Sequence, residues 1–113
     1  MTVAAIRQTS NGDGQRIGAR LFVWCPGCDE LHAIGVTGDD GIRPPVEWTW
    51  DGDLDAPTVS PSILVRGGRQ GSDHVCHSYL ERGRWRFLGD STHAFAGVTD
   101  VPMVPLPEWV TRP

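Results

Sequence analysis

The sequence contains no lysine and no long apolar run, and both absences limit what the protein can be. All ten basic residues are arginines, and the 14 acidic residues give a formal net charge of −4. A protein that binds nucleic acid without sequence preference usually presents a basic face, so this charge argues against such a role. No run approaches the ~20 apolar residues that span a bilayer. We therefore expect neither a membrane segment nor a nucleic-acid partner.

Cysteine is scarce as well, with only three in the chain. An odd number of thiols cannot all pair in internal disulfides, so a reducing compartment and a bound metal explain them better than a secreted disulfide scaffold. Residues 1–7 lack the long apolar core of a signal peptide, which agrees with that compartment. We expect the protein to be made in a cytoplasm.

Glycine and proline, by contrast, are abundant, with 14 and 9 copies in 113 residues. This composition is typical of short strands joined by turns. A chain of this length fits one domain and buries somewhat under ~70% of its extended surface, so its core is thin. We expect a single domain over residues 1–113, with an extended Pro-rich tail over 101–113 in which the prolines prevent a regular helix or a central strand.

Alternating apolar positions predict strands over residues 19–24, 31–36, 46–50, 62–65, 74–80 and 84–88. The first two and the last two of these strands form hairpins. Ser91 or Thr92 is expected to cap one helical turn over 94–96. The predicted fold is therefore mainly β: a small, zinc-ribbon-like β-hairpin domain with one short helical turn.

The motif Cys25-Pro26-Gly27-Cys28 lies at the tip of the first predicted hairpin. Two thiols three positions apart, with proline and glycine between them, form a tight turn whose sulfurs converge, and this is half of a tetrahedral zinc site. Cys76 is the only other thiol in the chain. Because zinc prefers thiolate ligands, we expect Cys76 to be the third ligand.

The fourth ligand is expected to be a histidine. Side chains alternate along a strand, so Cys76 and His77 point to opposite faces and do not easily bind one ion. His93 follows the partner strand and can fold back onto the site, so it is the expected ligand, with His77 and His32 as alternatives. His74, beside a glycine-rich loop, is expected to be exposed. A Cys3His set has no open position, which is typical of a structural Zn²⁺ site, and no catalytic residue is predicted.

Several longer motifs occur in order along the chain: Trp24-Cys25-Pro26-Gly27-Cys28 with His32, Trp48 to Gly52, Pro57-Thr58-Val59-Ser60-Pro61-Ser62, Cys76-His77-Ser78, and Phe87 to Gly97. Together they resemble a family of small zinc-motif proteins from phages, prophages and bacteria, some of which carry the label ammonia monooxygenase. The resemblance covers about residues 21–107. It implies a zinc-binding β fold and a phage-type origin, and it implies no particular activity. Relatives often carry cysteine where Ser91 stands here.

The closed metal site leads to a functional hypothesis. We expect a non-enzymatic, zinc-stapled, phage-type protein that acts through contacts with other proteins. It would act as a homo-oligomer or as a small tail or capsid component, made in the host cytoplasm and incorporated in the virion. Trp48, Trp50 and Trp109 are the expected interface residues, because aromatic side chains anchor many interfaces.

Two other functions stay open on this sequence. If water held the fourth position on the zinc, the site would have hydrolytic potential, and Asp90, His77 and His93 would serve a metal-dependent hydrolase. The second alternative is an inhibitor of a host defence protein, which would use the same kind of interface. A Cys76 nucleophile with His77 as its base is disfavoured, because alternation points the two side chains apart.

Overall fold

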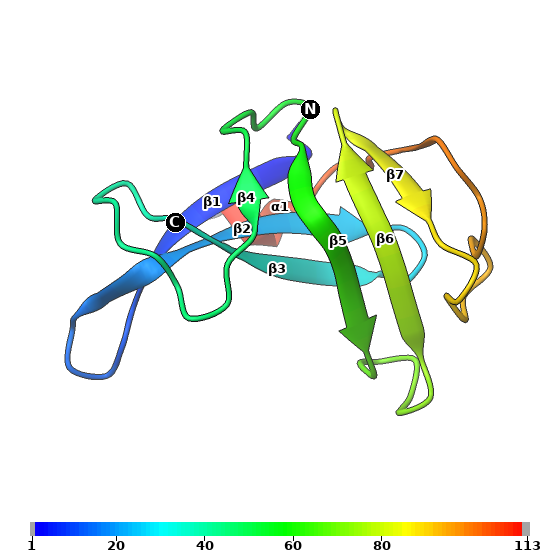
Figure 1. The fold of residues 1–113 in the computed structure, drawn as a ribbon, viewed down its shortest axis with the longest axis horizontal. Helices are drawn as coiled ribbons and strands as arrows, with labels where there is room; N and C mark the ends of the chain where they lie inside the picture. Colours follow the sequence, from blue (N-terminus) through cyan, green and yellow to red (C-terminus); the bar gives the residue numbers. More distant parts are fainter. Residues whose placement is uncertain (1, 112–113) are drawn as a thin grey trace.

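The computed structural model describes residues 2–111 as strands joined by turns, with one short helix (Figure 1). The strands are β1 (Ala4–Ser10), β2 (Arg16–Cys25), β3 (Glu30–Val36), β4 (Thr49–Trp50), β5 (Val59–Arg66), β6 (Val75–Glu81), β7 (Arg84–Phe87) and β8 (Val101–Pro102), and the helix is α1 (Glu108–Thr111). They form two antiparallel sheets, one of β1-β2-β3 and one of β4-β5-β6-β7-β8. The mainly β fold predicted from the sequence is confirmed.

The core lies between the two sheets, and its residues come from both. Figure 1 shows β5 and β6 crossing over the strands of the β1–β3 sheet, with β7 beside β6. Inward and outward side chains alternate as the two-residue period of a strand requires. Cys76 and Ser78 of β6 are buried, whereas His77 between them is partly exposed. Trp85 and Phe87 of β7 are fully buried and stack with ring centroids 5.7 Å apart; burying the phenylalanine alone contributes roughly 1.5–3 kcal/mol.

Strand β5 is irregular next to the candidate site described below. Its register with β6 shifts between the pairs Val59↔Leu80 and Ile63↔Ser78. Extra residues of this kind form a bulge, which bends a strand and re-aims its side chains. After the bulge, Leu64 pairs with His77. Ser62 is two residues before Leu64, so it lies on the same outer face of the sheet as His77.

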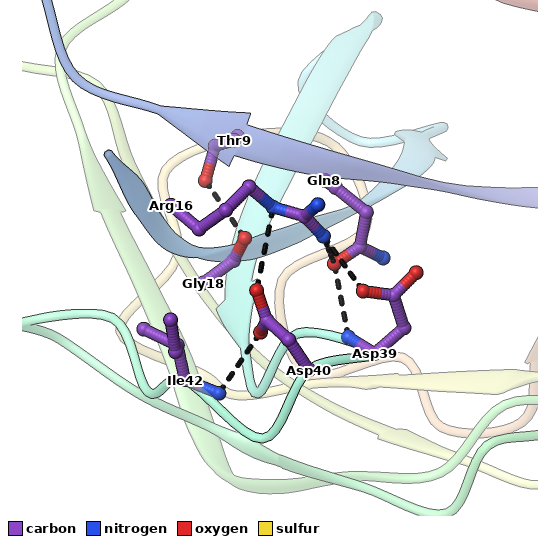
Figure 2. A network of polar contacts seen from close by, with 7 residues as sticks. All are labelled: Gln8, Thr9, Arg16, Gly18, Asp39, Asp40 and Ile42. Atoms are coloured by element: carbon purple, nitrogen blue, oxygen red, sulfur yellow. Dashed lines mark hydrogen bonds and ion pairs between the residues drawn. The ribbon is translucent and has the colours of Figure 1, made fainter. Parts of the chain in front are cut away.

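A polar network joins the β1–β2 hairpin to the loop after β3 (Figure 2). The guanidinium of Arg16 lies 2.6 Å from Asp39 Oδ1 and 3.5 Å from Asp40 Oδ2, and it donates to Gln8 Oε1 at 2.9 Å. Gln8 Oε1 accepts a second hydrogen bond, from the backbone N–H of Asp39 at 3.0 Å. These ion pairs are partly exposed, so each adds little stability. Their effect is to fix the loop that leads to Trp48.

The helical turn is at a different place from the predicted one. Residues 94–97 form turns, and the chain's single helix among the described residues is α1. Pro107 directly precedes α1, where a missing N–H removes no helical hydrogen bond. The Val110 N–H donates to the Pro107 carbonyl at 3.1 Å. No helix within residues 2–111 is long and apolar enough to cross a membrane.

The C-terminal segment packs on the body of the molecule. β8 pairs with β7, and Met103, Leu106 and Val110 are buried. The Leu106 N–H donates to the Thr2 carbonyl at 2.8 Å, and the Arg7 guanidinium donates to the Val110 carbonyl at 3.1 Å. The tail is therefore extended only in part, and it lies along β1. Residues 112 and 113 of the predicted tail lie outside the described residues.

Candidate metal centre and candidate active site

Three thiols and one imidazole meet between the sheets, from Cys25, Cys28, Cys76 and His32. Each residue offers one ligand atom, these atoms all lie within 4.8 Å of one another, and all four residues are buried. β2 ends at Cys25, the following turn brings back Cys28, β3 supplies His32, and β6 supplies Cys76. The Cys25 and Cys76 sulfurs are 3.8 Å apart, and the Cys28 N–H lies 3.4 Å from Cys25 Sγ. This cluster can hold a metal ion.

One unpaired atom supports a metal at this place. Nε2 of His32 is buried and has no hydrogen-bond partner within residues 2–111, which is rare for a polar atom inside a protein. None of the three cysteines forms a disulfide. A set of three thiolates and one imidazole nitrogen is a common donor set for a tetrahedral ion. The residues present therefore fit the group that the sequence predicts.

His32, an alternative in the sequence analysis, joins the three thiols, whereas His93 does not belong to this group of four. His93 still packs against the cluster, with its Nε2 3.2 Å from Cys76 Sγ. Its ring also lies directly over Gly27, where an added Cβ would be 2.4 Å from His93 Cε1. The turn between the two cysteines therefore needs glycine, because the imidazole fills the space of a side chain.

His74 is buried, contrary to the exposure expected from the loop before it. It is 5% exposed, its Nε2 lies 3.1 Å from Cys28 Sγ, and its Nδ1 lies 3.4 Å from Thr92 Oγ1. The inward alternation of β6 continues one residue before the strand begins, so His74 faces the same side as Cys76. Three imidazoles thus surround the thiols.

The thiols perturb one another strongly. Hydrogen bonds from the Cys28 and Cys76 thiols lower the pKa of Cys25 far below its usual value. The hydrogen bond with Cys25 is also the main cause that raises the pKa of Cys28 far above its usual value and that of Cys76 to about 12. Burial lowers the pKa of His93. Metal ligation requires deprotonated thiols, so an ion bound here would displace protons from the cluster.

On the opposite face of β6, His77 lies between a hydroxyl and a carboxylate. Its Nε2 is 3.0 Å from Ser62 Oγ. Its Nδ1 is 3.0 Å from Asp90 Oδ2 and 3.2 Å from Asp90 Oδ1. When Nδ1–H donates to the carboxylate, Nε2 is free to accept the proton of the serine hydroxyl. This is the hydrogen-bond order of a Ser–His–Asp catalytic triad.

The segment after β7 places Asp90 beside His77. The Ser91 N–H donates to the Leu88 carbonyl at 3.1 Å, which closes a turn with Asp90 inside it. The Ser91 hydroxyl accepts the His77 N–H at 3.0 Å and donates to the His77 carbonyl at 3.1 Å. The Thr92 N–H donates to the Val75 carbonyl at 2.8 Å. Residues 88–92 therefore continue along β6 where β7 stops, and they hold the carboxylate in register with the imidazole.

The three residues are accessible from outside. The side chains of His77 and Asp90 are 25% and 59% exposed, and Ser62 is partly exposed. The buried cluster differs in this respect, because its cysteines are at most 1% exposed. Ser62, His77 and Asp90 are therefore in contact with solvent, whereas the thiols are not.

Two of these three residues were predicted from the sequence in a different role. His77 and Asp90 were possible partners of an open zinc, whereas the structure pairs them with each other and with Ser62. Ser62 was not predicted as a catalytic residue, although it lies in the motif Pro57 to Ser62, because its contact with His77 depends on the irregular pairing of β5 with β6. One signal in the sequence was available. Side chains alternate along β6, so His77 points away from the thiols, and its hydrogen-bond partners had to be sought on the outer face of the sheet.

The predicted interface tryptophans differ in exposure. Trp48 and Trp50 are partly buried and pack against the core. The Trp48 Nε1–H donates to the Ser62 carbonyl at 3.2 Å, and the Trp50 Nε1–H donates to the Asp53 carbonyl at 3.1 Å. Trp109 in α1 is 60% exposed. Of the three, Trp109 offers the most free surface, and Trp48 contacts the candidate active site.

Comparison with known families gives one match over most of the chain. Residues 4–88 match the family BubE, described as a bacterial ubiquitination-like system serine protease. Ser62 and His77 lie within the matched residues, and Asp90 follows two positions after their end. No curated protein and no solved structure matches the chain. The likeness to phage zinc-motif proteins is not affected by this match and stays a prediction.

Proposed function

The chain belongs to the BubE family, and from this membership and the site geometry we propose that it is a serine protease with Ser62, His77 and Asp90 as catalytic residues. The observation that carries the proposal is the continuous hydrogen-bonded chain from hydroxyl to imidazole to carboxylate, with 3.0 Å at each step. The description of the family supports an amide bond in a protein of a bacterial ubiquitination-like system as the substrate.

Each catalytic residue has one task in the reaction. His77 Nε2 accepts the hydroxyl proton while Ser62 Oγ forms a bond to the carbonyl carbon of the scissile amide, and Asp90 stabilises the resulting imidazolium. His77 then donates that proton to the leaving amine as the C–N bond breaks, which leaves an acyl ester on Ser62. A water molecule, deprotonated by His77, attacks the ester and releases the acid, and the proton returns to Ser62 Oγ.

We further propose that the buried cluster binds Zn²⁺ in a structural role, through Cys25, Cys28, Cys76 and His32. Four protein ligands complete a tetrahedral shell and leave no position for a substrate. The low exposure of these residues, at most 5%, supports the same conclusion. Such an ion contributes folding free energy. It also fixes β6, the strand that carries His77.

The proposal is tested with a fluorophosphonate probe, which reacts with activated serine hydroxyls. The full-length protein should be labelled, and Ser62→Ala should abolish the labelling. Ser60→Ala is the matched control, because Ser60 is an exposed serine two positions earlier on the same strand. Labelling that persists in Ser62→Ala contradicts the proposal.

The earlier hypotheses give different results in the same experiment. For a non-enzymatic virion component, no serine of the protein reacts with the probe. For a metal-dependent hydrolase built on Asp90, His77 and His93, Ser62→Ala keeps its activity and only metal removal abolishes it. Only a serine protease predicts both results: the native protein is labelled at Ser62, and Ser62→Ala loses labelling and hydrolysis together.

A further inference from the structure

We infer that the substrate binds as an extended, largely apolar strand in the groove between β3 and β5, hydrogen-bonded to the backbone of Leu64. This inference rests on the proposed function, because it takes Ser62 as the nucleophile. It adds the location, the conformation and the side-chain chemistry of the bound peptide.

The groove has a volume of about 310 Å³. β3 lines it with Leu31 and Ala33, β5 lines it with residues 63–65, and Trp48 completes the lining. Apart from Glu30 and the buried His32, its side chains are apolar. Leu64 is 45% exposed, so its side chain is free to contact a ligand. A groove of this composition favours a peptide with apolar side chains.

The backbone of β5 is open along this groove. The Gly67 N–H donates to the His74 carbonyl at 2.8 Å, so this pair marks the hydrogen-bonded positions of the β5–β6 ladder. Hydrogen-bonded pairs alternate in an antiparallel ladder, which makes Ile63 and Val65 the residues that bond to β6. The N–H and C=O groups of Leu64 therefore point to the other edge of β5.

Within residues 2–111, no strand covers that edge beside Leu64. β4 pairs only with Val59 and Ser60. The chain before β4 leaves the sheet instead, and the Trp48 N–H donates to the Gly35 carbonyl of β3 at 2.8 Å. An open strand edge is a template for an added strand, and extended peptides bind many proteins in this way.

The open edge ends close to the nucleophile. Ser62 precedes Leu64 by two residues, which corresponds to about 7 Å along a strand. The Trp48 indole already occupies the Ser62 carbonyl, so a peptide strand beside β5 finds its first free backbone partner at Leu64. Because the indole closes the edge beside Ser62, a peptide paired at Leu64 would leave the edge there and cross the outer face, where Ser62 Oγ lies against His77, so that one amide meets the triad.

The first test compares Leu64→Pro with Leu64→Ala. Both variants lose the leucine side chain, but only proline loses the N–H, which makes no bond to β6 and can be removed without breaking the sheet. The substrate is the best-cleaved member of a library of internally quenched octapeptides. Relative to Leu64→Ala, Leu64→Pro should lower kcat/KM about tenfold, the effect of one lost hydrogen bond. Fluorophosphonate labelling of Ser62 should be retained in both.

The second test blocks the groove from its other wall. Ala33 is an exposed residue of β3 that faces the groove, and Ala33→Trp should lower kcat/KM for the octapeptide while labelling by the small probe persists. Ser10→Trp, at an exposed end of β1 away from the groove, is the matched control. N-methylation of the octapeptide should reduce cleavage at alternate positions only, because alternate N–H groups face β5.

The outcomes separate this inference from the proposed function. If Ser62 of the native protein does not react with the probe, the protease and the groove both fail. If Ser62 reacts, but no octapeptide is cleaved or Ala33→Trp cleaves as fast as Ser10→Trp, only the groove is overturned. If Leu64→Pro loses labelling as well, the strand itself is disturbed, and the Ala33→Trp comparison decides.

Discussion

The two faces of β6 carry two different kinds of site, one residue apart. Cys76 points inward to a cluster of thiols and is 1% exposed. His77 points outward, and its side chain is 25% exposed between Ser62 and Asp90. The first site is suited to stabilising the fold, and the second is suited to receiving a substrate. Because side chains alternate along a strand, the thiol cluster and the candidate active site lie on opposite faces of β6. Substitutions on the inner face should therefore change mainly stability, and substitutions on the outer face should change mainly activity.

The largest effect is expected for Cys76→Ala. Loss of one thiolate should release the metal and, with apparent binding free energies on the order of 10–16 kcal/mol for such sites, unfold the domain. Hydrolysis should be lost with the fold, although no metal takes part in the proposed reaction. Metal analysis and circular dichroism measure both changes, with Ser72→Ala as an exposed control. A Cys76→Ala protein that is folded and active without metal would contradict the stabilising role of the inner face of β6.

The next comparison tests which histidine completes the cluster. His32→Ala should lose most of the bound metal, because His32 belongs to the group of four. His93→Ala should retain the metal with an affinity lowered roughly 10–100-fold, as for residues that only support ligands. Competition with a coloured chelator measures both affinities. The opposite order, with metal lost only in His93→Ala, would restore the ligand set expected from the sequence.

On the outer face, Asp90→Asn should reduce kcat about 10⁴-fold, because the imidazole loses the group that fixes its tautomer. The Asp90 side chain is 59% exposed, so the free energy of unfolding should change by no more than about 0.5 kcal/mol. Steady-state kinetics and thermal unfolding of the same preparation measure the two quantities. If stability and kcat fell together, the two faces would not be separable.

The smallest effect on kcat is expected for Ser91→Ala, which also lowers the stability of the fold. It removes the two hydrogen bonds to the His77 backbone and leaves a part-buried N–H without its partner, which costs up to about 1 kcal/mol of stability. The triad should become less well positioned, so kcat should fall by much less than in Asp90→Asn. Ser91→Thr keeps the hydroxyl and should recover part of both losses. An unchanged melting temperature in Ser91→Ala would show that the hydroxyl has no positioning role.

Features set by local chemistry could be predicted from the sequence. The Cys25 to Cys28 turn, the two hairpins around it and at residues 74–88, and the inward direction of Cys76 all depend on neighbouring residues and on the period of a strand. The helical turn was expected near residue 95, but it forms after Pro107, where tail packing on β1 selects it. Propensity over three or four residues is too weak to distinguish the two places.

Two features depend on non-local geometry: the position of His32 beside the three thiols and the contact of Ser62 with His77. His32 is opposite Val23 in the β2–β3 ladder, and its distance to Cys76 is set by the angle at which the two sheets cross. Ser62 reaches His77 because of the bulge in β5, which the sequence signals only through the surrounding prolines. A register shift cannot be predicted from the sequence of one strand, because it describes how two paired strands are aligned. These are the points at which the structure adds the most.

The metal cluster also has a consequence for the order in which the chain folds. Every ladder in the two described sheets joins strands that are consecutive in the chain, so each sheet can form from local hairpins. The contact between Cys25 and Cys76 spans 51 residues, and within residues 2–111 no strand ladder joins one sheet to the other. A cross-link that closes a loop of this length restricts the unfolded chain by about 4 kcal/mol in the chain-entropy model. A metal ion bound at the cluster would therefore link the two sheets, and we expect the docking of one sheet on the other to depend on the metal concentration.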